Sequence, residues 1–488
     1  MAESVRRLRA IAAGAALAVA GVAAAAPTEP CRLKGVDREV RCGAVAVAED
    51  PDQPAGRRID VHYAVVPALA RVRALEPVFV FAGGPGQSAR RAAGPLQPLF
   101  ARLNARRDIV YVDQRGTGAS NPLACDGERR PAASLAETLD AERLSARTRE
   151  CLRRLGEAND LRQYATWIAV RDVDAVRAAL GYEQVNLWGA SYGTRAALEY
   201  LRQFPQRVRS VVLDGVAPAD MALPASFAVD AQASLDRLIA ACAADVDCRR
   251  RYPDLGSRVE RLLQRVGGGD LSATVTHPLT GRPEELRLQP ATLASVLRVP
   301  LYSPPLAAVL PYALAEAGRD NLTPLVAVAS SLTAGVAENF AEGMHFAVVC
   351  AEDMPRVDAA ARAAAMATRF GGSFLRTYEE ACAAVPTREV PAAFYRLSDA
   401  DVPVLILSGG ADPATPPRHG ERVAKGLRRA THLVAPHLAH GVSMQGCAPE
   451  LLAGFIRNAG TDGLDLGCLA RLPAPRYFAP PSGEERAR

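Results

Sequence analysis

The stretch Gly189-Ala-Ser-Tyr-Gly193 decides the fold of this 488-residue chain. An apolar run at residues 185–188 precedes it and predicts a buried strand, and residues 194–201 follow with helical spacing. A serine on a tight strand-to-helix turn, flanked by small residues, is typical of a nucleophile elbow that projects Ser191 above a sheet. The amide of Tyr192 would then point at an oxyanion formed there. An ordinary glycine-bounded turn fits the five residues alone, but the flanking elements favour the catalytic interpretation.

Composition and charge place the chain among globular proteins. It is 49% hydrophobic and 23% charged, with a mean hydropathy of 0.00. Residues 1–25 predict a secretory signal peptide, because three arginines precede a short apolar run and an alanine-rich cleavage site. Without those residues the formal charge falls from +5 to +3, which argues against a nucleic-acid partner. We expect a periplasmic or secreted protein with no stable membrane anchor after signal cleavage, although a retained anchor is the alternative.

The cysteines support an oxidising compartment. An even number behind a secretory signal predicts disulfides, and pairing between sequence neighbours is the simplest arrangement. A mixture of disulfides and buried thiols is the alternative. No Cys-x-x-Cys with partner histidines appears, so we expect neither a metal nor another cofactor. The ten residues are Cys31, Cys42, Cys125, Cys151, Cys242, Cys248, Cys350, Cys382, Cys447 and Cys468.

A second glycine-rich turn precedes the elbow. Residues 78–82 form an apolar run that predicts a parallel strand, and Gly83-Gly84 follow it directly. A strand that ends in glycines exposes backbone amides, which in α/β-hydrolases supply the second oxyanion donor. A plain tight turn is the alternative for this segment.

Alternation of strands and helices predicts an α/β fold with a doubly wound, mostly parallel sheet. The alternation stops near residue 218 and resumes near residue 399, so a mainly helical cap is predicted between, before the acid-bearing strand. The predicted organisation is a signal peptide (1–25), a first part of the core (26–217), the cap (218–398), a C-terminal part of the core (399–473) and an unstructured, proline-rich tail (474–488).

The remaining catalytic candidates lie after later strands. A serine nucleophile needs a base, and the base needs a carboxylate that fixes its tautomer. Asp412 and His440 follow Ser191 in the α/β-hydrolase order, each just past a predicted strand. Asp214 is the rival acid and His437 is the rival base.

These motifs as a set resemble the proline iminopeptidase group. The chain is most similar to its secreted, tripeptidyl aminopeptidase-like (TAP-like) branch of serine exopeptidases. The resemblance implies the α/β-hydrolase fold, Ser191, Asp412 and His440 as the triad, and oxyanion donors from Gly83-Gly84 and Tyr192. One departure is Ala82, where the family often has histidine, so no role of that side chain carries over.

Exopeptidases of this group bind the substrate's free amino terminus with a glutamate in the cap. Glu352 is the candidate here, with Asp353 as runner-up, and a disulfide between Cys350 and Cys382 would hold their loop rigid. A solvated acidic pair is the alternative.

The function predicted from the sequence is therefore a serine aminopeptidase that releases proline, a dipeptide or a tripeptide from peptides with a free amino terminus. A carboxylesterase or lipase with the same triad is the alternative. A non-catalytic binding protein is disfavoured by the complete set of Ser, Asp and His.

Overall fold

The computed structural model describes residues 28–70, 75–125, 134–269, 271–277, 280–337 and 340–480. The predicted signal peptide, residues 1–25, and the last residues of the predicted tail, 481–488, lie outside these ranges. Within the described ranges, no helix is both long and apolar enough to span a bilayer.

One mixed sheet organises the chain. Its strands follow the order β1-β2-β3-β5-β4-β6-β7-β10-β11. From β5 to β11 all neighbours are parallel, and β1, β2 and β3 add an antiparallel edge. The expected mostly parallel sheet is confirmed. The strands are β1 (Glu29–Cys31), β2 (Val40–Ala48), β3 (Arg58–Val66), β4 (Leu75–Phe81), β5 (Arg107–Val112), β6 (Val185–Ala190), β7 (Val208–Asp214), β10 (Val404–Gly409) and β11 (Ala430–Ala435).

Helices cover both faces of this sheet, because its central strands are apolar on both sides. In β4, Val78 and Val80 pack into one hydrophobic cluster, whereas Phe79 and Phe81 pack into the cluster on the opposite face. The first cluster lies under α1 (Ala89–Asn104) and α17 (Ala448–Asn458). The second lies under α4 (Thr166–Ala179), α5 (Tyr192–Gln203) and α16 (Pro417–Gly426). The doubly wound architecture is therefore confirmed.

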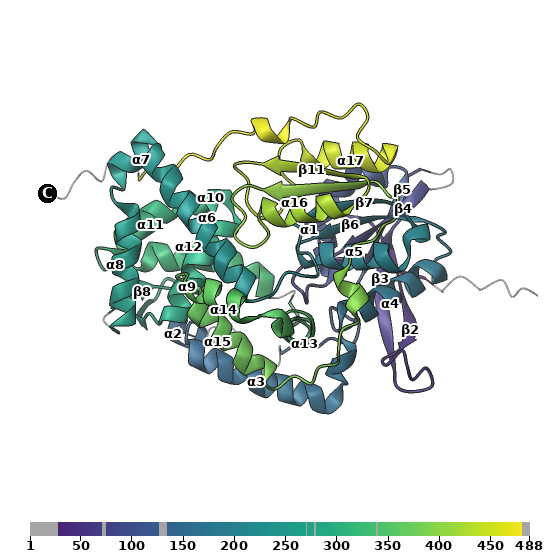
Figure 1. The fold of residues 1–488 in the computed structure, drawn as a ribbon, viewed down its shortest axis with the longest axis horizontal. Helices are drawn as coiled ribbons and strands as arrows, with labels where there is room; N and C mark the ends of the chain where they lie inside the picture. The colour runs from purple at the N-terminus through teal and green to yellow at the C-terminus, as the bar shows by residue number, and fades with distance from the viewer. Residues whose placement is uncertain are drawn as a thin grey trace, which may run out of the picture.

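A mainly helical cap lies beside the sheet, as Figure 1 shows. It is inserted between β7 and β10 and has its own hydrophobic cluster. A hairpin within it is formed by β8 (Ser272–Thr276) and β9 (Pro283–Arg287). Its helices are α6 (Ala225–Ala244), α7 (Val246–Arg251), α8 (Leu255–Gly267), α9 (Pro290–Arg298), α10 (Pro304–Ala307), α11 (Leu310–Ala317), α12 (Thr323–Ala337), α13 (Glu342–Glu352), α14 (Ala359–Met366) and α15 (Gly371–Cys382).

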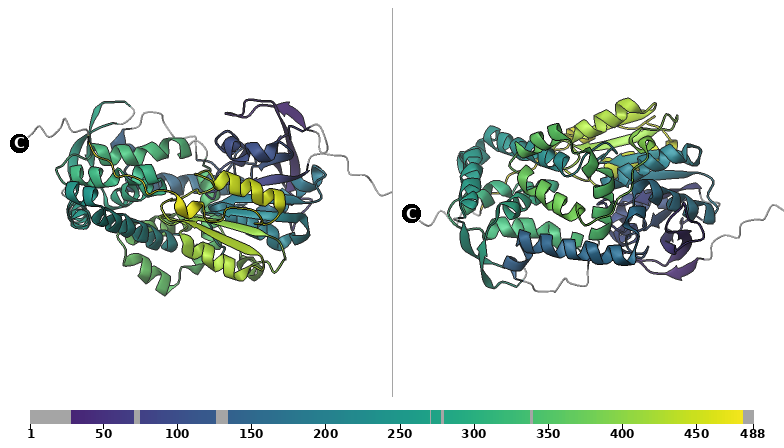
Figure 2. Two further views of the ribbon diagram at one scale, coloured as in Figure 1. Left: turned by 90° about the horizontal axis from the view of Figure 1, so that it is seen from above. Right: turned by 60° about the horizontal axis from the view of Figure 1, so that its bottom comes forward.

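Two helices from the first half of the chain also contribute to this layer. The helix α2 (Leu135–Thr138) contacts β9, and α3 (Ala141–Ala158) contacts α13 and α15. In Figure 2, right, α3 runs along the lower edge from the sheet to the cap. Helices from outside the predicted boundaries 218–398 therefore pack against the cap, which the sequence did not reveal because an amphipathic helix does not show which surface it covers.

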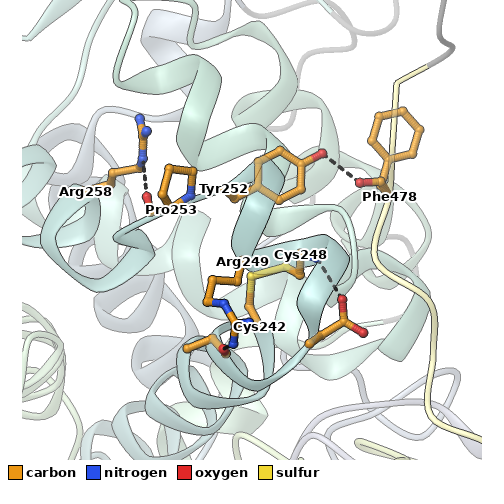
Figure 3. The surroundings of a disulfide bond; sticks show 9 residues. Cys242, Cys248, Arg249, Tyr252, Pro253, Arg258 and Phe478 are labelled. Atoms are coloured by element: carbon orange, nitrogen blue, oxygen red, sulfur yellow. Dashed lines mark hydrogen bonds between the residues drawn. A yellow bond between two sulfur atoms is a disulfide. The ribbon is translucent and has the colours of Figure 1, made fainter.

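The start of the predicted tail is packed, which corrects the expectation of an unstructured segment from residue 474. The amide of Phe478 donates to the carbonyl of Ala308 at 3.0 Å, and the hydroxyl of Tyr252 donates to the carbonyl of Phe478 at 2.7 Å. Figure 3 shows the second bond beside the Cys242–Cys248 disulfide. The backbone of Phe478 thus attaches the start of the tail to the cap.

All ten cysteines form disulfides, and each disulfide joins sequence neighbours as expected. Such a set of disulfides is typical of oxidising compartments. The pairs are Cys31–Cys42, Cys125–Cys151, Cys242–Cys248, Cys350–Cys382 and Cys447–Cys468.

Candidate active site

Ser191 occupies the turn between β6 and α5. Its φ and ψ are 55° and −127°, a conformation that non-glycine residues rarely adopt. The surroundings hold it there, because its N–H donates to the carbonyl of Asp214 at 2.9 Å and its carbonyl accepts from the N–H and hydroxyl of Thr194. A Cβ at Gly193 would collide with the carbonyl oxygen of Phe81. The turn has the strain and close packing of a nucleophile elbow.

The glycine-rich turn after β4 lies against this serine. A Cβ built on Gly83 would stand 3.2 Å from the Cβ of Ser191. In the ranges that the structure describes, the N–H of Tyr192 donates to no protein acceptor. The cap is joined to the same turn, because the N–H of Ala341 donates to the carbonyl of Gly86 at 2.8 Å. The predicted oxyanion segments are thus brought together beneath the cap.

Asp412 and His440 form a pair at the neighbouring strand ends, in which Asp412 is buried and His440 is partly exposed. Asp412 follows β10, His440 follows β11, and His440 Nδ1 lies 2.8 Å from Asp412 Oδ2. Two amides, from Ala414 and Thr415, donate to Asp412 Oδ1 at 2.8 and 2.9 Å. The hydroxyl of Thr415 donates to Asp412 Oδ2 at 2.8 Å. These bonds fix the position of the carboxylate. Because Nδ1 of His440 faces Asp412, the other ring nitrogen, Nε2, is available to a substrate.

The pair lies next to the elbow. A Cβ on Gly215 would meet His440 Cε1 at 3.4 Å and Asp412 Oδ2 at 3.5 Å. Gly215 directly follows Asp214, whose carbonyl receives the N–H of Ser191. Its φ of +65° and these contacts leave room only for glycine.

The rival acid, Asp214, has a different set of partners. Its carboxylate accepts from the N–H of Val442 at 2.8 Å and from the N–H and hydroxyl of Ser443 at 2.8 and 2.5 Å. Asp214 therefore holds the loop that follows His440. The rival base, His437, is exposed.

Charge distinguishes the two carboxyls. Burial raises the pKa of both, but at Asp412 the facing His440 and the donated hydrogen bonds outweigh burial and hold the pKa below its usual value. At Asp214 burial prevails and the pKa is raised. Burial lowers the pKa of His440, yet the Asp412 carboxylate outweighs burial and raises it overall. Asp412 is thus the ionised partner of His440.

The acidic pair in the cap is fully buried, which excludes the solvated alternative. Glu352 and Asp353 each have 0% exposed surface, and both contact Arg195 of α5. Arg195 Nη1 and Nη2 donate to the carboxylate of Asp353 at 3.0 and 2.9 Å, whereas Nη1 lies 3.2 Å from Glu352 Oε2. Two carboxyls therefore share one cation.

Glu352 also connects to the elbow through a third residue. The N–H and hydroxyl of Thr166 donate to its carboxylate at 2.6 and 3.0 Å, and that hydroxyl lies 2.7 Å from the hydroxyl of Tyr192. Burial, with the nearby Asp353 adding to it, raises the pKa of Glu352 to about 7 despite Arg195. Of the two carboxyls, Glu352 is therefore the one that Arg195 matches less completely.

Sequence reasoning missed Arg195, Thr166 and Thr415 as parts of the site. An arginine one turn into an apolar elbow helix was a usable signal for Arg195, because a buried arginine needs carboxylate partners. Thr415 stands three residues after Asp412, which is the spacing of a side-chain turn. Thr166 carried no signal, since its partner Glu352 is 186 residues away.

Two family models match separate parts of the chain. Residues 76–263 match a family model described as the alpha/beta hydrolase fold, and residues 367–468 match a model described as TAP-like protein. The chain is a serine hydrolase with the α/β-hydrolase fold. The second match covers the segment of this hydrolase that contains Asp412 and His440, which fits the predicted TAP-like resemblance.

Two relatives of the hydrolase are peptidases by name. The serine protease Hip1 of Mycobacterium tuberculosis is 28% identical over 473 residues, which cover 88% of each chain. The tripeptidyl aminopeptidase of Streptomyces lividans is 30% identical over 243 residues, 46% of this chain and 44% of that protein. A solved hydrolase from Pseudomonas aeruginosa is 16% identical with a TM-score of 0.36, covering 85% of this chain and 97% of its own.

Proposed function

We propose that this hydrolase is a secreted or periplasmic serine exopeptidase that cleaves short segments from the free amino termini of peptides. Ser191 is the nucleophile, His440 the general base and Asp412 the group that orients His440. As Ser191 Oγ attacks the peptide carbonyl, His440 Nε2 takes its proton. When the C–N bond breaks, His440 returns that proton to the leaving amine. Water then repeats the sequence on the acyl-enzyme and releases the segment as a carboxylic acid.

The oxyanion of each tetrahedral intermediate is held by backbone amides. The N–H of Tyr192 is at the start of α5, where the helix dipole adds to its attraction for a negative charge. The Gly83-Gly84 turn, which lies against Ser191, supplies the second donor. Both donors belong to the backbone, so replacing the family's histidine by Ala82 leaves this role intact.

The incomplete pairing of Glu352 with Arg195 is the observation that carries the exopeptidase proposal. Asp353 is matched by Arg195 in a two-bond contact, and Glu352 is left with a single, longer contact to the same cation. A substrate ammonium would restore the balance at Glu352, next to Thr166 and the elbow residue Tyr192. Endopeptidases and esterases need no such charge. Because Arg195 matches Asp353 more completely than Glu352, Glu352 is favoured over Asp353 as the amine anchor.

The relatives support the same proposal. The names serine protease and tripeptidyl aminopeptidase describe those proteins, and we transfer to this chain the release of short amino-terminal segments, with a tripeptide as the leading size. Release of proline or of a dipeptide is the alternative for the size of the released segment. Five disulfides fit a protein that works outside the cytoplasm.

Replacement of Glu352 tests the amine anchor. In Glu352→Gln we expect kcat/KM for a free-amine peptide anilide to fall about 10- to 100-fold, the value of a hydrogen bond to a charged group. Hydrolysis of a small neutral ester should change much less. Glu260→Gln, which alters an exposed cap carboxylate paired with Arg369, is the matched control and should affect neither substrate.

Equal losses on both substrates in Glu352→Gln would show that Glu352 only supports the fold of the site. An enzyme that cleaves esters but no free-amine peptide would be the carboxylesterase that the sequence left open.

A further inference from the structure

Arg298, at the end of α9, lies over three aromatic rings. Its guanidinium carbon stands 4.3 Å from the ring centre of Phe227, 5.0 Å from that of Tyr302 and 5.5 Å from that of Phe374. The Nη2 group also donates a hydrogen bond to the hydroxyl of Tyr302. Aromatic faces attract a cation, yet they do not neutralise it.

The charge of Arg298 has no carboxylate partner among the described residues. No Asp or Glu oxygen in those ranges lies within 4.0 Å of it, and its buried Nε has no hydrogen-bond acceptor. Other buried arginines differ: Arg115 makes two bonds to Asp172, and Arg195 contacts Asp353 and Glu352. A partly buried cation with spare donors is costly unless an anion completes it. The position therefore fits an anion that arrives from outside.

Arg298 is on the His440 side of the site. Tyr302, which it contacts, packs edge-on against the imidazole of His440 at a ring distance of 5.2 Å. The N–H of His440 donates to the carbonyl of Tyr302 at 3.3 Å. His440 is the group that protonates the leaving amine, so the substrate residue that carries this amine lies beside His440. Glu352, by contrast, reaches the elbow through Tyr192.

We propose that Arg298 binds a carboxylate on the leaving side of the scissile bond. This inference rests on the exopeptidase function proposed above and extends it to the class of substrate. A peptide would be held by its ammonium at Glu352 and by a carboxylate at Arg298, with the reacting carbonyl between them. The carboxylate comes either from the free carboxyl terminus of a short peptide or from an acidic side chain next to the cleaved bond.

Matched peptides separate these two sources. Three amino-terminal segments with a free amino group serve as leaders: Pro, Ala and Ala-Ala-Pro. Each leader is joined to alanine with a free carboxyl terminus, to alanine carboxamide and to aspartic acid α-carboxamide. For the leader that the wild-type enzyme cleaves, we expect kcat/KM for the free acid to exceed that for the alanine carboxamide at least tenfold. A similar gain for the aspartate peptide alone would identify the side chain as the source.

Variants of Arg298 identify the group responsible. In Arg298→Gln the ratio of kcat/KM between acid and carboxamide should fall to near one, and Arg298→Lys should retain part of it, because lysine keeps the charge without the planar fork. Arg319→Gln, an exposed arginine of the cap, should keep the wild-type ratio. The same leader as a 4-nitroanilide reports whether the site remains intact.

The outcomes are distinguishable from a failure of the exopeptidase proposal. A wild-type enzyme that cleaves free-amine anilides with no preference for a carboxylate would overturn the role of Arg298 alone. Equal losses on every substrate in Arg298→Gln, with the ratio preserved, would also overturn it, because that pattern describes a structural residue. No cleavage of any free-amine substrate would overturn both proposals.

Discussion

His440 is hydrogen-bonded to Asp412 and not to Asp214, although Asp214 ends β7 and Asp412 follows the end of the neighbouring parallel strand β10. Nδ1 of His440 lies 2.8 Å from Asp412 Oδ2, whereas the oxygens of Asp214 accept from Val442 and Ser443. One carboxylate thus orients the imidazole, and the other holds the loop that carries it.

This division predicts different effects for two matched substitutions. Asp412→Asn should lower kcat about 10⁴-fold with little change in folding, since the amide favours the wrong tautomer of His440. Asp214→Asn should lower the free energy of unfolding by about 1–3 kcal/mol, because it leaves a donor facing the donors of Ser443, and it should lower kcat far less. Steady-state kinetics and denaturant unfolding of both variants check this. The reverse order of kcat losses would make Asp214 the catalytic acid.

Arg195 should matter for stability more than any exposed arginine. Arg195→Met leaves two buried carboxyls without their cation, which should cost about 3–5 kcal/mol. The cost should be larger at pH 8 than at pH 5, because without Arg195 the buried carboxyls keep protons that the unfolded chain releases as the pH rises. Urea unfolding at both pH values measures this.

The control for that measurement is Arg153→Met. Arg153 pairs with Glu150 on an exposed face of α3, where water and salt screen the pair, so its loss should lower the free energy of unfolding far less than the loss of Arg195. Similar losses in the two variants would mean that the buried cluster contributes no more than a surface ion pair.

The Cys350–Cys382 disulfide should stabilise the protein more than Cys242–Cys248. The two pairs are separated by 32 and 6 residues in sequence. Chain-entropy arguments then give about 4 and about 2 kcal/mol. The double variants Cys350→Ser/Cys382→Ser and Cys242→Ser/Cys248→Ser should lose thermal stability in that order. The first should also raise KM for free-amine substrates, because Glu352 is two residues from Cys350. The opposite order of stability would contradict the entropic account.

Two groups should shape the acid side of the pH profile. His440 must be neutral to act as a base, and the Asp412 carboxylate raises its pKa despite burial, so kcat/KM for a neutral ester should rise with pH to a midpoint above 6.5. Free-amine peptides need Glu352 ionised as well, and its pKa is about 7. Their kcat/KM should therefore fall more steeply below pH 7 than that of the ester.

The Glu352→Gln variant provides the control for this profile. Its residual activity on free-amine peptides should fall with acid only as steeply as ester hydrolysis. Identical slopes for both substrates in the wild-type enzyme would indicate that Glu352 does not titrate with amine binding.

The fold and the triad candidates were predictable because their signals are local. Ser191, Asp412 and His440 each follow a short apolar run and precede a glycine, a proline or a helix, so neighbouring residues reveal both the strand end and the polar residue that follows it. The five disulfides likewise join neighbours in the sequence.

The charge pattern around the triad was not predictable, because its partners are distant in the chain. Arg195 and Asp353 are 158 residues apart, and Arg298 contacts aromatic rings from α6, η4 (Val299–Tyr302) and α15. The packing of α3 and of Phe478 on the cap has the same cause. The sequences of α3 and of the segment around Phe478 predict an apolar surface but do not show which part of the chain covers it.

Hydrolysis of matched free and N-acetylated peptide anilides by the mature enzyme tests the central claim most directly, with Ser191→Ala alongside. The exopeptidase account predicts that Pro-, Ala- or Ala-Ala-Pro-4-nitroanilide is cleaved only when its amino group is free, and that Ser191→Ala loses about 10⁶-fold in kcat. The preferred leader would give the number of residues released. Equal cleavage of the free and acetylated forms, or activity that survives Ser191→Ala, would contradict the account.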